Sequence, residues 1–311
     1  MLNLTHLKLV FPPNFKIVFV RFIINKQFEI MKTSIKQFAV TVLSCLLGIA
    51  VAAQTAAPVP YYLVVTTMHS KSKIKDFSMD EWKKVEKEYY DKVVSKNEHM
   101  LASNVMTHYF TADNTEILFI TLYKDWSAIE KAGLRTEELV KAGWSDGKNR
   151  DAFFDKRAAY YEHKHSDEIY VTVPGMKELA AKPDKPMIYY VRKSSMDYPK
   201  DGSEKDFDAL NKQYMDAVIN KNDLVKAYYQ YAHAYGSNRT DYVEISVFET
   251  LGDIEKSFDK TETLFKAAWA DEKKRKQYED NIARYFVGSH GDYVYRSVPE
   301  LMKSANHSAA K

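Results

Sequence analysis

The chain has 311 residues, and its 45% hydrophobic and 28% charged content is typical of a folded globular protein and not of a disordered or collagen-like one. Its 45 Lys and Arg residues nearly balance 42 Asp and Glu residues, so the formal net charge of +3 does not indicate nucleic-acid binding. The single cysteine, Cys45, excludes an intrachain disulfide and a four-cysteine zinc site. The sequence also lacks the short motifs of nucleotide-binding, serine-hydrolase and zinc-protease sites.

The first predicted element is an export signal at residues 31–53, beginning at Met31. Lys32 and Lys36 form a basic region, an apolar run follows over 39–51, and small residues surround position 52, as in a secretory signal peptide. The run is shorter than the roughly 20 residues of a membrane-spanning helix. We therefore expect cleavage within 52–54, export to the periplasm or the medium, and no transmembrane span.

The segments next to this signal allow a second interpretation. Residues 1–30 are interpreted as a non-native or extended N-terminus. Cys45 follows Val42-Leu43-Ser44, so lipid attachment at Cys45 is the minor alternative to release. Six basic residues and one acidic residue lie within 1–53, and the remainder carries slightly more acidic than basic residues. The basic character of the full chain thus belongs to the segment that we expect to be removed.

The rest of the sequence is an internal duplication, which a shift of 125 residues reveals without a gap. His108 then matches His233, Trp144 matches Trp269, and Asn97 matches Asn222. The His-x-Asp-x-[Ile/Val]-Tyr stretch at 165–170 recurs at 290–295. The predicted organisation is a first repeat at 58–174, a linker at 175–185, a second repeat at 186–299 and a flexible tail at 300–311.

Each repeat is predicted to contain the same elements in the same order. In the first repeat, strands are expected at 61–69, 103–111, 116–123 and 167–173 from their β-rich composition. Helices are expected at 78–97, 127–141 and 148–162, and the first begins with a capping box at Ser78 and Glu81. The order β-α-β-β-α-β is that of a ferredoxin-like unit.

Two such units in tandem resemble the dimeric α/β-barrel superfamily, whose members include antibiotic-biosynthesis and haem-degrading monooxygenases, chlorite dismutases and stress-responsive barrel proteins. The repeated His-x-Asp stretch is also similar to that of secreted bacterial proteins. The resemblance implies an α+β fold in which two ferredoxin-like units pack sheet to sheet as an intramolecular pseudo-dimer. It implies a monomer and carries no catalytic residue across.

Strand alternation predicts which side chains face the space between the sheets. On the third strands, we expect one aliphatic row to lie under the helices: Leu118, Ile120, Leu122 and Val243, Ile245, Val247. The opposite, mixed row would then face inward, together with one face of the second strands. These rows predict a small-molecule cavity walled by His108, Phe119, Tyr123, Tyr170, Tyr231, His233, Tyr242, Glu244, Ser246 and Tyr295. The alternative is a close-packed interface between the sheets.

Several of these residues could also carry chemistry. His108 and His233 could bind a metal or haem or act as a general base, or they could be buried neutral imidazoles. The pairs His165–Asp167 and His290–Asp292 are weaker candidates for metal ligands, with turn stabilisation as the alternative. Glu244 replaces Phe119 at the matching position, and a carboxyl on an aromatic wall is expected to have a raised pKa or to pair with Lys193 or Arg192.

The sequence leaves three functions open. We favour an exported protein that binds a small aromatic or apolar ligand between its sheets. The alternatives are a haem- or cofactor-dependent, monooxygenase-like oxidoreductase, and a non-catalytic structural or interaction protein with a filled barrel. No cofactor is identified by the residues, and whether the protein catalyses a reaction stays open because fold is a poor guide to chemistry.

Overall fold

The computed structural model describes residues 60–71 and 78–304. The predicted signal peptide, Cys45, residues 1–30 and positions 305–311 lie outside the described residues. The first repeat contains β1 (Tyr62–Ser70), α3 (Met79–Lys92), β2 (Ala102–Phe110), β3 (Glu116–Tyr123), α4 (Trp126–Gly143), α5 (Gly147–Ala158) and β4 (Tyr161–Thr172). The second contains β5 (Ile188–Met196), α6 (Glu204–Ala217), β6 (Ala227–Tyr235), β7 (Asp241–Phe248), α7 (Gly252–Ala268), α8 (Glu272–Ala283) and β8 (Phe286–Ser297).

Local sequence signals determine where the helices begin. The Ser78 hydroxyl accepts a hydrogen bond from the backbone N–H of Glu81 at the start of α3. The matching helix α6 begins with a complete capping box between Ser203 and Asp206. Asp146 caps α5 in the same way. Such caps satisfy backbone N–H groups that have no partner within the helix.

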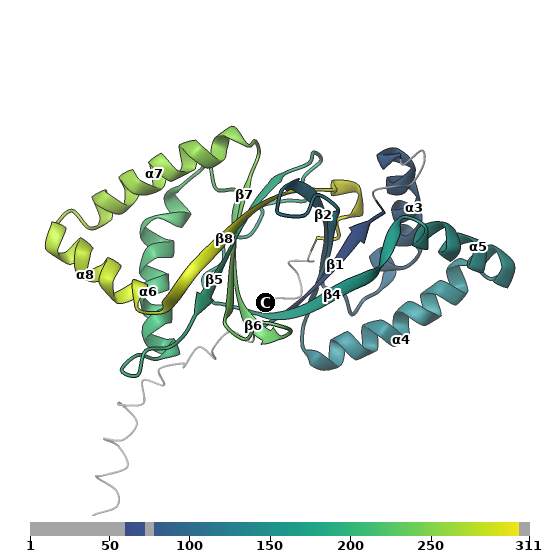
Figure 1. The fold of residues 1–311 in the computed structure, drawn as a ribbon, viewed down its shortest axis with the longest axis horizontal. Helices are drawn as coiled ribbons and strands as arrows, with labels where there is room; N and C mark the ends of the chain where they lie inside the picture. The colour runs from purple at the N-terminus through teal and green to yellow at the C-terminus, as the bar shows by residue number, and fades with distance from the viewer. Residues whose placement is uncertain (1–59, 72–77, 305–311) are drawn as a thin grey trace, which may run out of the picture. The chain divides into compact units, whose positions relative to one another are not determined.

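The eight strands form one closed antiparallel barrel in the order β1-β3-β2-β8-β5-β7-β6-β4. Each repeat contributes four adjacent strands, and the two sheets join where β2 pairs with β8 and where β4 pairs with β6. The helices α3–α5 cover one side of the barrel and α6–α8 cover the opposite side (Figure 1). This is the predicted α+β fold of two ferredoxin-like units packed sheet to sheet.

The pairing of the strands corrects the expected gapless duplication at one place. Tyr62 pairs with Tyr123 in the first repeat, whereas Ile188 pairs with Phe248 in the second. Since Phe248 is the counterpart of Tyr123 at the 125-residue shift, β1 and β5 correspond at a shift of 126. The equivalent of Arg192 is therefore Thr66 and not Thr67.

The strand register also shows that the predicted faces of β3 and β7 were assigned the wrong way round. Residues paired directly across an antiparallel ladder point to the same side. Met106 pairs with Leu118, and Tyr231 pairs with Val243, so the aliphatic rows of β3 and β7 share the interior with the inward faces of β2 and β6. The mixed row that begins at Ile117 and its counterpart on β7 therefore face the helices.

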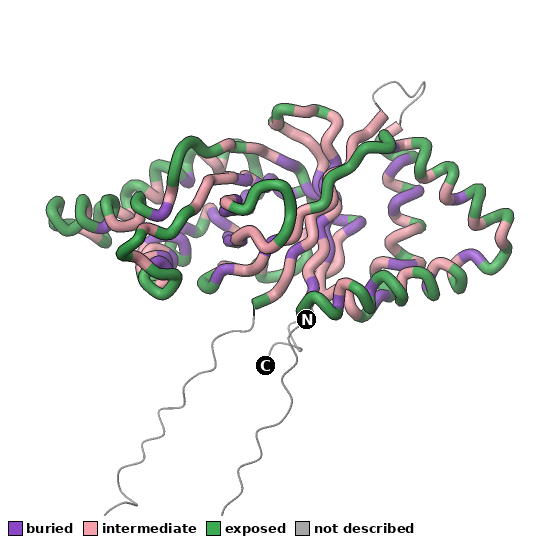
Figure 2. The backbone as a smooth tube through the Cα atoms, turned by 60° about the horizontal axis from the view of Figure 1, so that its bottom comes forward, coloured by how far each residue is buried: buried purple, intermediate pink, exposed green. Residues whose placement is uncertain are grey.

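The barrel interior holds one continuous cluster of side chains from both sheets. Its buried members are Leu63, Met106, Leu118, Ile120, Tyr170, Met187, Tyr189, Val191, Ala227, Tyr231, Val243, Ile245, Val247 and Tyr295. Separate clusters lie between each sheet and its helices, and the outer helix surfaces are exposed (Figure 2). The wall residues that we expected to form one cavity between the sheets are thus divided between this packed interior and the two outer faces.

The segments after each repeat are more ordered than expected. Lys177, in the predicted linker, forms a β-bridge with Tyr228. The 3₁₀ helix η3 (Pro299–Leu301) buries Leu301, and Lys303 forms a bridge with Ser103. The expected flexible tail therefore does not begin at residue 300. None of the described helices is both long and apolar enough to cross a membrane.

Candidate functional site

The structure divides the ten predicted cavity residues between two environments. Five belong to the barrel interior or its ends: His108, Tyr170, Tyr231, His233 and Tyr295, with His108 paired to Tyr295 and His233 paired to Tyr170 along the strands. The other five lie on the outer faces of β3 and β7: Phe119, Tyr123, Tyr242, Glu244 and Ser246. Of the second group, only Glu244 and Ser246 line a cavity described here.

This cavity lies in the second repeat, between the outer face of the sheet and helices α6 and α7. It has a volume of about 280 Å³, near the lower end of the range for small-molecule pockets. The strands contribute Tyr190, Arg192, Tyr228, Glu244, Ser246 and Phe248, and the helices and adjoining loop contribute Tyr214, Ile219, Val225, Ser257, Phe258 and Thr261. Aromatic rings thus form much of the wall, and the polar groups converge on the sheet side.

Three charged residues on neighbouring strands form a row across the cavity side of this sheet. Arg192 on β5 lies directly opposite Glu244 on β7 and Asp292 on β8. The Arg192 Nε donates to Asp292 at 3.0 Å, and a terminal nitrogen donates to the Tyr190 hydroxyl at 3.0 Å. Tyr190 in turn donates to Asp292 at 2.6 Å. The guanidinium is therefore held by Asp292 and Tyr190.

Glu244 has weaker compensation for its charge. Among the described residues, Tyr228 is the hydrogen-bond donor to its carboxyl group. Burial raises the pKa of Glu244, while the Tyr228 hydrogen bond and the nearby Arg192 oppose that rise. By contrast, hydrogen bonds from Tyr190 and Arg192 lower the pKa of Asp292 against the effect of its partial burial. The pKa values of the two carboxyl groups in the row are thus shifted in opposite directions. Shifted pKa values are common in functional sites.

The tyrosines of the cavity remain protonated at neutral pH. Burial, with the hydrogen bond to Asp292, raises the pKa of Tyr190 to about 12. Burial, with the negative charge of Glu244, raises the pKa of Tyr214 to about 12 as well. These hydroxyls can therefore donate hydrogen bonds to a ligand, but they do not supply phenolate.

The first repeat has a cluster of aromatic side chains around the position that corresponds to Glu244. Phe119 occupies the position of Glu244 and packs against Tyr161, with ring centroids 6.0 Å apart. Trp82 is fully buried beside them, and its Nε1 donates to the Tyr161 hydroxyl at 2.8 Å. Glu86 lies next to this group, accepts from Tyr161 at 2.7 Å, and pairs with Arg157 at 2.8 Å. Trp82, Glu86 and Tyr161 correspond to Phe207, Asn211 and Phe286, which pack in the core of the second repeat as well. Of this group, Phe119 is the one whose counterpart, Glu244, lines the cavity of the second repeat.

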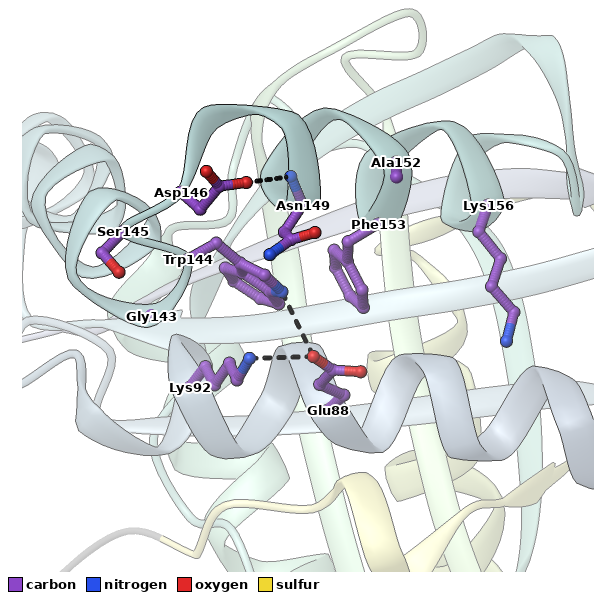
Figure 3. A pocket seen from close by; sticks show the side chains of 10 residues that line it. All are labelled: Glu88, Lys92, Gly143, Trp144, Ser145, Asp146, Asn149, Ala152, Phe153 and Lys156. Atoms are coloured by element: carbon purple, nitrogen blue, oxygen red, sulfur yellow. Dashed lines mark hydrogen bonds and ion pairs between the residues drawn. The ribbon is translucent and has the colours of Figure 1, made fainter.

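A second cavity lies in the first repeat, between α3 and the bend that joins α4 to α5 (Figure 3). It has a volume of about 510 Å³. Trp144 stacks on Phe153 at 4.3 Å, the Lys92 ammonium lies 4.2 Å from the Trp144 ring centre, and the indole N–H donates to Glu88. Trp144 is thus covered on both faces by the protein itself, which is consistent with a packing role.

The second repeat fills the space that corresponds to this second cavity. Phe265 stands where the first repeat has Val140, and its ring centroid is 4.8 Å from that of Trp269. Tyr278 replaces Phe153, and its hydroxyl reaches the backbone carbonyl of Leu210 at 3.1 Å. Phe265 and Tyr278 thus pack against Trp269 at the positions that Val140 and Phe153 occupy in the first repeat.

The described histidines do not gather into a group that could hold a metal ion. His165 contacts Asp167 and His290 contacts Asp292, each at 3.3 Å. Across residues 60–71 and 78–304, however, no group of three His, Cys, Asp or Glu side chains could hold a metal ion. His108 is hydrogen-bonded to Thr111 at 2.7 Å, whereas the buried Nδ1 of His233 has no hydrogen-bond partner among the described residues.

The residues present do not fit a haem. Haem iron is held by His, Cys, Met or Tyr side chains, and the lining of the second-repeat cavity contains only tyrosines from this set. Their raised pKa values disfavour the phenolate form. His108 and His233 belong to the barrel, whose interior is packed with side chains. We therefore derive no chemistry through a haem at either position.

Comparisons with known proteins leave the activity open. No family model matches the sequence, and no curated protein matches it. A suggested monooxygenase from Lactobacillus acidophilus NCFM is similar in structure at 11% identity and a TM-score of 0.46, covering 79% of this chain and 96% of that one. An anthrone oxidase-like protein matches at 13% identity and a TM-score of 0.45, covering 79% and 94%. A cyanide-bound variant of chlorite dismutase from Candidatus Nitrospira defluvii matches at 11% identity and a TM-score of 0.42, covering 78% and 92%.

Sequence reasoning identified Glu244 but placed it on the wrong side of the sheet. It named Arg192 only as a possible partner and missed the roles of Tyr190, Tyr214 and Tyr228. The sequence did contain a feature that could have revealed the charged row. The repeats differ at two paired positions, since Thr66 and Phe119 in the first correspond to Arg192 and Glu244 in the second. A comparison at a constant shift of 125 residues does not show this, because β1 and β5 correspond at a shift of 126.

Proposed function

We propose that this protein is an exported small-molecule-binding protein whose ligand site is the second-repeat cavity behind β5, β6 and β7. The observation that supports this most directly is the half-buried Glu244 carboxyl, which faces an aromatic-walled space of about 280 Å³. A buried carboxyl has a cost unless a partner compensates for it. The first repeat avoids that cost with Phe119, which shows that the fold does not require an acid at this position.

The cavity has the composition of a ligand pocket. Its wall combines aromatic and aliphatic side chains with a few convergent polar groups, as pockets for small molecules generally do. Its volume suits a ligand of one or two rings. The site lies on the helix side of the sheet, whereas the sequence predicted a cavity on the interior side. The packed barrel interior holds β5, β6 and β7 in place beneath the site.

The proposal is tested by closing the cavity. In Ser246→Leu, the larger side chain would occupy the space beside Glu244. The matched control is Thr121→Leu, which makes the same kind of change at the corresponding position of the first repeat, where the proposal places no ligand. A panel of one- and two-ring aromatic compounds of neutral, positive and negative charge is screened by thermal shift and confirmed by calorimetry.

At a concentration of 100 times its Kd, a bound compound should add about 2.7 kcal/mol to the stability of the folded state. We expect at least one compound to stabilise the wild type and Thr121→Leu but not Ser246→Leu. If no compound binds, or if every hit binds Ser246→Leu equally well, the proposal is wrong. A protein with a filled barrel and a structural or interaction role would then be the better interpretation.

A further inference from the structure

The charged row of the cavity has more negative than positive groups. It contains two carboxyl groups, Glu244 and Asp292, and one guanidinium, Arg192. Arg192 donates its hydrogen bonds to Asp292 and Tyr190. Its positive charge is therefore paired with Asp292 and not with Glu244. Glu244 accepts a hydrogen bond from the neutral hydroxyl of Tyr228. The group without a contacting countercharge is thus the one that lines the cavity.

The rings around Glu244 favour the same sign of ligand charge. Tyr190, Tyr214, Tyr228, Phe248 and Phe258 line the cavity, and Tyr190 and Phe258 meet edge to face at 5.6 Å. Aromatic faces attract cations, and several rings around one site form the cages that recognise ammonium groups. An anion would meet the negative faces of these rings and a carboxyl group that no cation contacts directly, while Arg192, which also lines the cavity, is already paired with Asp292.

We propose that the ligand of this cavity is an organic cation, a ring compound whose protonated amine or quaternary ammonium group lies against Glu244 among these aromatic side chains. This inference rests on the proposed function, since it assigns the charge of the ligand at the same site. The ligand's ammonium would supply the countercharge that Arg192 gives to Asp292. Its ring would occupy the apolar part of the cavity beside Ile219 and Val225.

Two matched series of probes test the sign of the charge. The first is tryptamine, tryptophol and indole-3-acetate, which share an indole ring and carry a cation, a neutral hydroxyl and an anion. The second is phenethylamine, 2-phenylethanol and phenylacetate, which repeat the comparison with a smaller ring. Kd values are measured by calorimetry at pH 7.5 with the wild type, Glu244→Gln and Glu262→Gln. The last variant removes one exposed carboxylate on α7 that pairs with Lys266, so it controls for net charge.

In at least one series, we expect the amine to bind wild type about ten-fold more tightly than the alcohol, and the acid to bind most weakly. Glu244→Gln should bring the amine to the affinity of the alcohol, whereas Glu262→Gln should keep the preference. If the alcohol or the acid binds as tightly as the amine, or if Glu244→Gln keeps the preference, the inference is overturned while the proposed function stands. If no compound from the wider panel binds, the proposed function fails and the inference fails with it.

The pH dependence supplies a second readout. The charged and titratable groups that interact with Glu244 are Arg192 on β5, Tyr228 on β6, Tyr242 on β7, His290 and Asp292 on β8, and Tyr214 on α6. Since burial raises the pKa of Glu244, its carboxyl group loses its proton, and so becomes negatively charged, at a higher pH than an exposed glutamate. Amine affinity should therefore increase as pH rises through the pKa of Glu244 in wild type and in His290→Asn, and this increase should be absent in Glu244→Gln. A wild-type profile with the same shape as that of Glu244→Gln would contradict the contact with Glu244.

Discussion

The buried ion pair between Glu86 and Arg157 is expected to stabilise the first repeat strongly. Glu86 is 2% exposed and accepts three hydrogen bonds, from Arg157 Nε at 2.8 Å, from a terminal nitrogen of Arg157 at 3.0 Å and from the Tyr161 hydroxyl at 2.7 Å. The Arg157 guanidinium also lies 4.1 Å from the centre of the Tyr89 ring. The change Glu86→Gln keeps the shape of the side chain but removes its charge.

The expected loss follows from what remains after the change. Removing one partner of a buried ion pair costs about 3–5 kcal/mol because the other charge stays buried without compensation. Glutamine retains one acceptor oxygen, so we expect the lower end, about 3 kcal/mol. For a folded unit of this size, that loss corresponds to a fall in Tm of about 6–12 °C.

The assay is urea unfolding followed by far-UV and near-UV circular dichroism, together with a thermal melt. The double variant Glu86→Gln/Arg157→Met should recover most of the loss, because the unpaired charge is gone and a residue of similar volume fills the space. The control is Asp280→Asn, which removes an exposed partner of Lys276 on α8 and should leave the midpoint unchanged. If Glu86→Gln lowers stability no more than this control, the reasoning about buried charge is wrong.

Three further predictions test other parts of the chain. Asn97→Ala and Asn222→Ala should each cost about 2 kcal/mol in a urea titration, since both side chains are fully buried and hydrogen-bonded to the helix beside them; unequal losses would contradict equivalent roles in the two repeats. The pKa of Glu244 is raised above 4.5, so this group contributes stability below pH 4.5 that is lost as pH rises through its folded pKa, and Glu244→Gln should flatten that part of the urea-midpoint profile. Intact-mass spectrometry of the protein from its native cell should find a mature N-terminus within residues 52–54, whereas an N-terminus at Met1 or Met31 would refute cleavage.

The element order and the fold were predictable because they depend on patterns that survive in a single sequence. The duplication was visible in matches such as Trp144 with Trp269, and each repeat carries capping residues and β-rich runs at the same positions. The sequence therefore determined an eight-stranded pseudo-dimeric barrel. It did not determine which face of β3 points inward, because Leu118 and Phe119 are both apolar and alternation alone is symmetrical between the two sides.

The missing information was the register of the hairpin. Once Met106 is known to pair with Leu118, the inward face of β2 fixes that of β3, and the aliphatic row must lie inside. The same step moves Glu244 from the interior to the helix side. The cavity itself was harder to predict because it depends on residues from three strands and two helices, including Tyr214 and Phe258, which are far apart in the sequence.

The two repeats differ in the residues around the second-repeat cavity while they share one packed barrel interior. Changing Phe119 alone to glutamate would place a carboxyl group beside Tyr161, where Thr66 offers no positive charge and the Arg157 guanidinium, 5.9 Å from the Phe119 ring, is already paired with Glu86. The second repeat instead differs at both positions of the row, with Arg192 in place of Thr66 and Glu244 in place of Phe119. The packed barrel interior contains side chains from both sheets. The second repeat is therefore stabilised by this shared interior as well as by the packing of its own helices α6 and α7 on its sheet. The polar row and the open space beside it are therefore best explained together, as one departure from symmetry confined to the second repeat.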